Sequence, residues 1–135
     1  MKVFLDTNVV IDFLAKREPF FEDAERIFSL AENPAYELCI SALSFTNIAY
    51  ILRKHTSSIQ LLGLIESLLE LMTVLPTDRD VIEEALHAGF SDFEDAVQHF
   101  TAKRYGADAI ITRDKTGFAQ SALPVFHPSE WQYIK

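Results

Sequence analysis

The first ten residues, MKVFLDTNVV (residues 1–10), determine how the rest of the chain is interpreted. Residues 2–5 predict a short buried strand, and residues 9–16 predict a helix, with Asp6 between the two. A carboxylate at the end of a buried strand is costly unless it has a partner or a role. In a parallel α/β sheet the functional site lies beyond the carboxyl ends of the strands, where Asp6 would be. Alternatively, Asp6 simply caps the helix that follows.

The composition is that of an ordinary globular protein, with 49% hydrophobic and 24% charged residues in a chain of 135. This length suits one domain with a buried core, and we expect residues 1–135 to form it. Twenty acidic residues against twelve basic ones give a formal charge of −8. That balance argues against binding nucleic acid through bulk positive charge. It leaves room for a nucleic-acid enzyme whose positive charge comes from bound cations or from a partner.

No segment predicts export or membrane insertion. The most apolar stretch, IQLLGLIESLLELM, carries Glu66 and Glu70 at helical spacing, so it predicts an amphipathic helix. Asp6 breaks the apolar N-terminal stretch, and no small-residue cleavage site follows it. The single cysteine, Cys39, is expected to be a small buried hydrophobe in a reducing compartment. We therefore expect a cytoplasmic protein that does not enter a membrane.

Predicted strands alternate with predicted helices along the whole chain. The helix ends carry recognisable signals: Pro19 suits the first turn of the second helix, Thr77 the cap of the fifth, and Ser91 with Glu94 a capping box on the sixth. The alternation predicts a doubly wound α/β domain with a parallel sheet. The expected strands are 2–5, 37–41, 73–76, 107–112 and a short 124–126, and the expected helices are 9–16, 19–33, 43–55, 58–72, 78–89 and 91–105.

Acidic residues occur where three of these elements begin or end, in LDTN, SDFEDA and ITRD. Asp6 and Asp114 would both lie at carboxyl ends of strands, and Asp92 and Asp95 are three residues apart on one helix face. Asp114 has a plain alternative as a turn residue. Glu94 is left out of the predicted site because the capping box accounts for it.

Converging carboxylates need a neutralising cation. Two like charges about 4 Å apart repel by roughly 4 kcal/mol at an effective dielectric constant near 20. A hard divalent ion with oxygen ligands, Mg²⁺ or Mn²⁺, is the natural partner of such a group. The four histidines show no zinc-like spacing. His99, one turn after Asp95, is expected to be a helix-surface partner of that residue and not a ligand.

Four stretches together resemble the PIN domain family: MKVFLDTNVVIDFL, ISALSFTNIAYILRK, FSDFEDAVQHFTAKRYGADAIITRD and LPVFHPSEW. More narrowly, they resemble small bacterial and archaeal proteins akin to the ribonuclease toxins of toxin–antitoxin pairs. The resemblance implies a three-layer α/β/α fold around a mostly parallel sheet of four to five strands. It also implies a metal-dependent endoribonuclease that hydrolyses RNA phosphodiester bonds.

The resemblance assigns the site residue by residue. Asp6 matches the first metal-binding aspartate, Asp95 the third acidic position and Asp114 the fourth. Asn8 and Thr112 match polar residues that help to order the site. The resemblance implies that Asp6, Asp95 and Asp114 hold one or two ions, Mg²⁺ or Mn²⁺.

The second acidic position, usually a glutamate, falls on Asn47. An amide offers a neutral oxygen and cannot act as a base, so Asp92 is expected to supply the missing charge. The alternative is a catalytically weakened PIN-like module that acts by binding protein or RNA. A phosphoryl-transfer domain is disfavoured, because neither the aspartate pair of dehalogenase-like phosphatases nor the acidic pair and lysine of receivers is present.

The expected partners are an RNA substrate, an antitoxin protein and a second copy of the chain. RNA would be held by Arg113, Lys115 and the basic run 53–55, although these could equally be solvated helix ends. Residues 19–33 and 58–72 carry more apolar surface than one sheet face needs, which predicts a homodimer.

Overall fold

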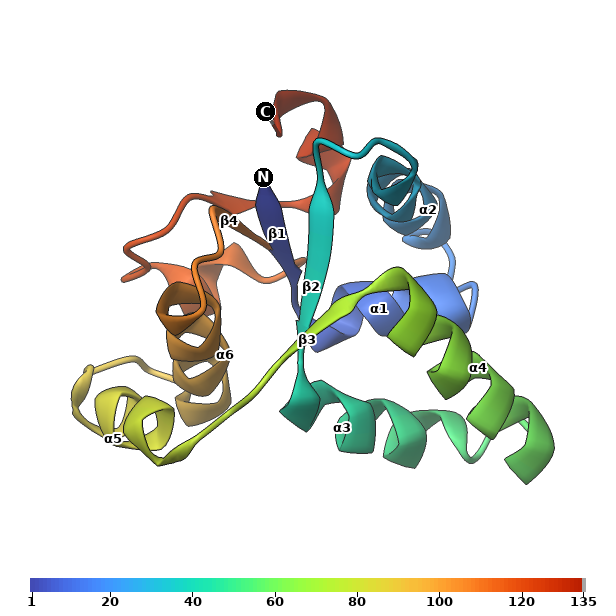
Figure 1. Cartoon of the computed structure of the whole chain (residues 1–135), viewed down its shortest axis with the longest axis horizontal. Helices are drawn as coiled ribbons and strands as arrows, with labels where there is room; N and C mark the ends of the chain where they lie inside the picture. Colours follow the sequence, from blue (N-terminus) through green and yellow to red (C-terminus); the bar gives the residue numbers. More distant parts are fainter. Residues whose placement is uncertain (135) are drawn as a thin grey trace.

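Five parallel strands form the centre of the molecule in a computed structural model, which describes residues 1–134 (Figure 1). Their order across the sheet is β3-β2-β1-β4-β5, and each neighbouring pair is parallel. The prediction of a parallel sheet of four to five strands is confirmed. The strands are β1 (Lys2–Leu5), β2 (Glu37–Ser41), β3 (Thr73–Leu75), β4 (Ala109–Ile111) and β5 (Val125–Phe126).

Helices cover both faces of this sheet and give three layers. The first four pack together on one face, and the last two lie on the other (Figure 1). The α/β/α architecture is therefore as predicted. The helices are α1 (Thr7–Leu14), α2 (Phe21–Ser29), α3 (Ala42–Leu52), α4 (Ser58–Leu71), α5 (Arg79–His87) and α6 (Phe93–Arg104), with short 3₁₀ turns η1 (Leu30–Glu32), η2 (Lys115–Phe118) and η3 (Pro128–Tyr133).

The central strand β1 is apolar on both faces, as expected for a sheet covered on both sides. Val3 and Leu5 point into the core under α1 to α4, whereas Phe4 points into the core on the α6 side. All three side chains are fully buried. Cys39 of β2 shares the face of Phe4, and it is buried and free as predicted, with burial raising the pKa of its thiol to about 11.

The strand order reverses beside β1. The chain builds β2 and β3 on one side of β1 and then crosses to build β4 and β5 on the other. Ligands of open α/β sheets bind at the carboxyl ends of the strands where this reversal occurs. The Asp6 amide donates to the Ile111 carbonyl at 2.9 Å, so the residues that follow β1 and β4 meet at this edge.

Five of the six predicted helix starts differ from the observed ones by one or two residues, and only the start of α4 is as predicted. Asp78, and not Thr77, caps α5, because its side chain accepts the Val81 amide at 3.1 Å. Thr77 turns inward and shares hydrogen bonds of 3.0 Å with hydroxyls of the sheet and of α6. Pro19 lies outside α2, whose first residue is Phe21.

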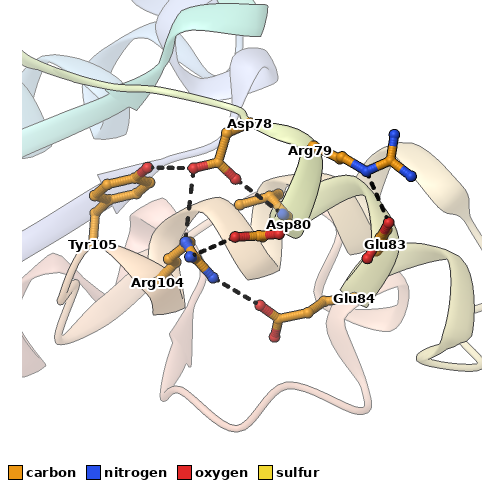
Figure 2. A network of polar contacts seen from close by, with 8 residues as sticks. Asp78, Arg79, Asp80, Glu83, Glu84, Arg104 and Tyr105 are labelled. Atoms are coloured by element: carbon orange, nitrogen blue, oxygen red, sulfur yellow. Dashed lines mark hydrogen bonds and ion pairs between the residues drawn. The ribbon is translucent and has the colours of Figure 1, made fainter.

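A surface network fastens the end of α6 to the start of α5 (Figure 2). The Arg104 guanidinium contacts Asp80 at 2.9 Å, Glu84 at 3.4 Å and Asp78 at 3.7 Å. The Tyr105 hydroxyl donates to Asp78 at 2.7 Å and holds the pKa of that carboxyl below its usual range. These contacts fix the orientation of α6, the helix that carries Asp92 and Asp95 at its other end.

None of the helices within residues 1–134 combines the length and the apolar character needed to cross a membrane.

Candidate active site

A polar cavity of about 420 Å³ opens at the carboxyl edge of the sheet, beside the end of β1. The four aspartates predicted from the sequence all line it, together with Asn8 and one further carboxylate, Glu94. The full lining is Asp6, Thr7, Asn8, Ile11, Arg17, Ile51, Asp92, Glu94, Asp95, Arg113 and Asp114. Segments from three separate parts of the chain thus bring five carboxylates to one place.

Asp6 serves both as a helix cap and as a wall of the cavity. It is 7% exposed, and its Oδ1 accepts the Thr7 amide at the start of α1 at 2.8 Å. Its Oδ2 accepts the Thr112 hydroxyl, also at 2.8 Å. Burial raises the pKa of Asp6, and these two hydrogen bonds offset part of that effect. Asp6 is therefore a helix cap, and the same side chain also lines the cavity.

Thr112 connects the ends of β1 and β4. Its side chain is fully buried, and its Oγ1 donates to Asp6 while accepting the Asp114 amide at 3.1 Å. Asp114 is exposed, and the Thr116 hydroxyl donates to it, which lowers its pKa. Thr112 thus links Asp6 to the backbone of Asp114.

The start of α6 differs from the prediction. Asp92 is the N-cap, and its Oδ1 accepts the Asp95 amide at 3.0 Å. The predicted capping box of Ser91 and Glu94 is therefore wrong, and the reason for leaving Glu94 out of the site is removed. The sequence was ambiguous here, because serine and aspartate are about equally good N-caps and are adjacent in this segment.

Asp95 is a second carboxyl of the cavity whose acidity is perturbed. Its pKa is raised to about 7, first by burial and then by the charges of Asp6, Asp92, Asp114 and Glu94. A glycine makes room for its carboxylate: a Cβ on Gly117 would overlap Asp95 Oδ2 and lie 3.0 Å from its Cγ.

A buried polar layer beneath the cavity joins α1, α3 and α6. The Thr7 and Ser44 hydroxyls are 2.8 Å apart, and the Gln98 amide donates to both, at 3.2 and 3.0 Å. All three side chains are buried, so the bonds hold the three helices in a fixed relation. Nothing in the sequence singled out Ser44 or Gln98, since their partners are 37 to 91 residues away.

Asn47 does not line the cavity. It lies half-buried on α3, and the residue that this helix presents to the cavity is Ile51, one turn later. The charge that the resemblance places at Asn47 is therefore absent from this wall. Asn8 does line the cavity, and its buried Oδ1 has no hydrogen-bond partner among residues 1–134.

His99 is not at the helix surface, as was predicted, but is 2% exposed. Its Nε2 accepts the Ala122 amide at 3.1 Å, and its ring packs against Phe90 and Phe100. Burial lowers the pKa of this imidazole to about 4. His99 is thus a buried, neutral side chain that packs in the core.

The oxygen atoms that line the cavity suit a hard divalent cation. They belong to carboxylates and to one amide without a hydrogen-bond partner within residues 1–134, and Mg²⁺ and Mn²⁺ prefer such ligands. Within residues 1–134 no three His, Cys, Asp or Glu side chains are arranged to hold an ion as they stand. Mg²⁺ usually keeps several water ligands and takes only one or two carboxylates, so an open acidic cavity is compatible with it.

Fold and site together define a parallel α/β domain with a carboxylate-lined cavity where the strand order reverses. A family model described as PIN domain matches residues 2–116. The chain belongs to the PIN domain family.

One relative is similar in sequence, and two solved structures share the fold. Ribonuclease VapC1 of Aquifex aeolicus (strain VF5) is 24% identical over 123 residues, which cover 87% of this chain and 85% of that protein. The structure of VapBC-1 from nontypeable Haemophilus influenzae aligns with a TM-score of 0.73 at 19% identity, covering 96% of this chain and 99% of the other. VapC20 of Mycobacterium tuberculosis, a sarcin-ricin loop cleaving toxin, aligns with a TM-score of 0.69 at 14% identity, covering 87% and 94%.

Proposed function

We propose that this protein is a divalent-metal-dependent endoribonuclease of the toxin type. The observation that carries the proposal is the position of Asp6 and Asp95. Both carboxyls have raised pKa values, and both line one cavity where PIN domain strands β1 and β4 end. Perturbed carboxyls gathered in a cavity are typical of functional sites. The related VapC1 is a ribonuclease.

Asp6, Asp95 and Asp114 would hold Mg²⁺ or Mn²⁺, with Asp92 assisting. A bound ion of this kind would supply Lewis-acid stabilisation of phosphate charge and a water of lowered pKa. The chain's own contribution is positioning. Thr112 fixes one oxygen of Asp6, and Gly117 leaves space for Asp95.

An antitoxin is the proposed protein partner. The structure of a toxin–antitoxin complex from Klebsiella pneumoniae shares the fold, with a TM-score of 0.69 over 93% of this chain. A second, more apolar cavity of about 450 Å³ lies next to the acidic one and shares Ile11, Arg17 and Ile51 with it. A peptide seated there would reach the acidic cavity and could block it.

A homodimer and a cytoplasmic location complete the proposal. Apolar side chains remain exposed on α4, where Ile59 is 85%, Leu62 67% and Leu69 57% exposed. Exposed apolar groups on one helix favour association with another surface. Light scattering at tens of micromolar checks this, and a monomeric mass would contradict it. An RNA substrate would place the activity in the cytoplasm.

Cleavage of single-stranded RNA by the purified protein, with Mn²⁺ and with EDTA, tests the function. We expect Mn²⁺-dependent products with 5′-phosphate and 3′-hydroxyl ends, and no products from the Asp6→Asn variant. Equal cleavage by the parent and this variant would mean that the activity lies elsewhere or in a contaminant. No cleavage by a parent that nevertheless binds RNA or an antitoxin would favour the weakened binding module.

A further inference from the structure

A single buried carboxylate on α1 holds two arginines that are far apart in the sequence. Asp12 is 1% exposed and does not line the acidic cavity. Its Oδ1 accepts Nε of Arg17 at 2.8 Å, and its Oδ2 accepts Nε of Arg113 at 2.6 Å. Both oxygens of Asp12 are therefore occupied by guanidinium groups. Charge-assisted bonds of this kind are short, directional and strong when they are buried.

Each arginine has a second restraint. The Arg113 guanidinium carbon lies 3.9 Å from the centre of the Phe20 ring, and Nη2 of Arg17 approaches the Asn8 carbonyl at 3.5 Å. The side chains remain 40% exposed for Arg17 and 25% for Arg113. In neither guanidinium does Nη1 form a hydrogen bond with any of residues 1–134. The pair is thus oriented in advance and still has donors to offer.

Both arginines line the cavity of the five carboxylates. Within residues 1–134, Arg17 and Arg113 are the two cationic side chains that line this cavity, and the charge of Asp12 offsets one of their two charges. An RNA backbone that approaches the carboxylates meets strong repulsion unless positive charge lies beside its path. Guanidinium groups suit phosphate because their planar N–H pairs match its oxygens.

We propose that Arg17 and Arg113, oriented by Asp12, form a phosphate-binding site for the RNA backbone at the rim of the acidic cavity. The inference rests on the proposed function for the identity of the substrate. It adds a binding site for a phosphate beside the one at the carboxylates. Asp12 acts only through the two arginines and is a positioning residue.

The alternative role is that of a fixed counter-ion. In that case the arginines would only soften repulsion among the carboxylates and would not touch RNA. The two roles differ in their salt dependence. A side chain that neutralises one phosphate of single-stranded RNA contributes about 0.7 to the slope of log affinity against log salt concentration. An internal counter-ion contributes nothing to that slope.

The test measures binding of a fluorescently labelled single-stranded RNA by anisotropy between 50 and 200 mM KCl. Ca²⁺ replaces Mn²⁺, and a gel verifies that the RNA stays intact. The variants are Arg17→Ala, Arg113→Ala and, as a matched control, Arg79→Ala. Arg79 is also ion-paired, to Glu83 at 3.0 Å, but is 87% exposed on α5 and does not line the cavity.

We expect Arg17→Ala and Arg113→Ala each to weaken RNA binding about five- to tenfold and to reduce the salt slope by about 0.7. Arg79→Ala should change neither. If both cavity variants keep the parent's affinity and slope, the inference is wrong, even if the parent cleaves RNA. If the parent cleaves no RNA but these binding losses appear, the proposed ribonuclease activity fails and the phosphate site stands.

Asp12→Asn tests the positioning role. It keeps both positive charges, so RNA affinity and salt slope should stay at or above the parent values. The orientation of the guanidiniums is lost, so kcat for RNA cleavage should fall at least tenfold. A merely structural role would instead lower the folded fraction, which circular dichroism measures. In that case kcat per folded molecule would be unchanged. That outcome would remove Asp12 from the site.

Discussion

The replacement Asp95→Asn should stabilise the metal-free protein. The pKa of Asp95 is raised from 3.8 to about 7, because the folded protein partly buries its carboxyl and surrounds it with four other carboxylates. A difference of about three units at 1.36 kcal/mol each gives an upper bound of about 4 kcal/mol. Asp95 keeps some solvent contact, which screens its charge, so we expect about 2 kcal/mol.

The sign of the pH dependence follows from proton linkage. Between pH 4 and 7 the folded state keeps a proton on Asp95 that the unfolded state has lost. Parent stability therefore falls as pH rises through this interval. Asparagine has no such penalty. The advantage of Asp95→Asn should be near zero at pH 4, should grow toward pH 7 and should stay constant above it.

Urea unfolding in EDTA at pH 4.5, 6 and 8 measures this difference. At pH 8 we expect a higher free energy of unfolding by about 2 kcal/mol, or roughly 6 °C in melting temperature. Asp23→Asn on α2 is the control, since it removes a partly exposed aspartate outside the cavity, 3.8 Å from Arg26. Millimolar Mn²⁺ should then stabilise the parent more than the variant, by RT ln(1 + [L]/Kd).

Two results would refute the reasoning. If Asp95→Asn were less stable than the parent at pH 8 in EDTA, the carboxylates would not repel one another in the folded state. If the gain were the same at all three pH values, it would come from packing and not from charge. Either result would also weaken the case for a cation in this cavity.

Three further predictions follow from neighbouring contacts. Gly117→Ala should push the Asp95 carboxylate aside, because a Cβ would overlap its Oδ2. RNA cleavage should then fall at least tenfold while the melting temperature stays close to the parent's, and full activity would contradict this. Asp92→Asn should keep the parent's melting temperature, because asparagine caps helices as well as aspartate does. It should lower Mn²⁺-dependent cleavage at least tenfold, and parent-like cleavage would mean that Asp92 is only a helix cap. The unfolded state protonates His99 below pH 6.5, whereas the buried imidazole has a pKa of about 4, so the free energy of unfolding should fall by up to about 3 kcal/mol between pH 6.5 and pH 4. In His99→Gln the free energy of unfolding, measured in urea, should depend less on pH over that interval.

The sequence was sufficient for the fold because the evidence for each element is local. Short apolar runs such as residues 107–112 indicate strands, and apolar residues repeated at helical spacing indicate the helices between them. Both patterns can be recognised from residues that are close together in the sequence. The parallel sheet then follows from their alternation. The same logic placed Asp6 and Asp114 at carboxyl ends of strands. Those positions bring them to one cavity whatever the details of the packing.

The remaining features of the site depend on choices that local sequence leaves open. Ser91 and Asp92 compete as caps of α6, and one residue of difference decides whether Glu94 closes a capping box or faces the cavity. The burial of His99 depends on the Ala122 amide, 23 residues away. Asp12 was unremarkable in the sequence because its second arginine, Arg113, lies 101 residues further along.

The cavity places two demands on the same side chains, and the demands can be separated. Asp6 and Asp92 each cap a helix that starts at the cavity, and a cap requires only an acceptor oxygen. A divalent ion requires negative charge as well. The N-termini of α1 and α6 favour ionised carboxylates through their dipoles, so the fold tolerates the charge that the ion needs. Asparagine supplies the oxygen without the charge. Asp92→Asn should therefore leave the fold intact while removing negative charge that the ion needs. Asp6→Asn can keep the cap and removes the same charge, but it also loses the second oxygen, which accepts the Thr112 hydroxyl.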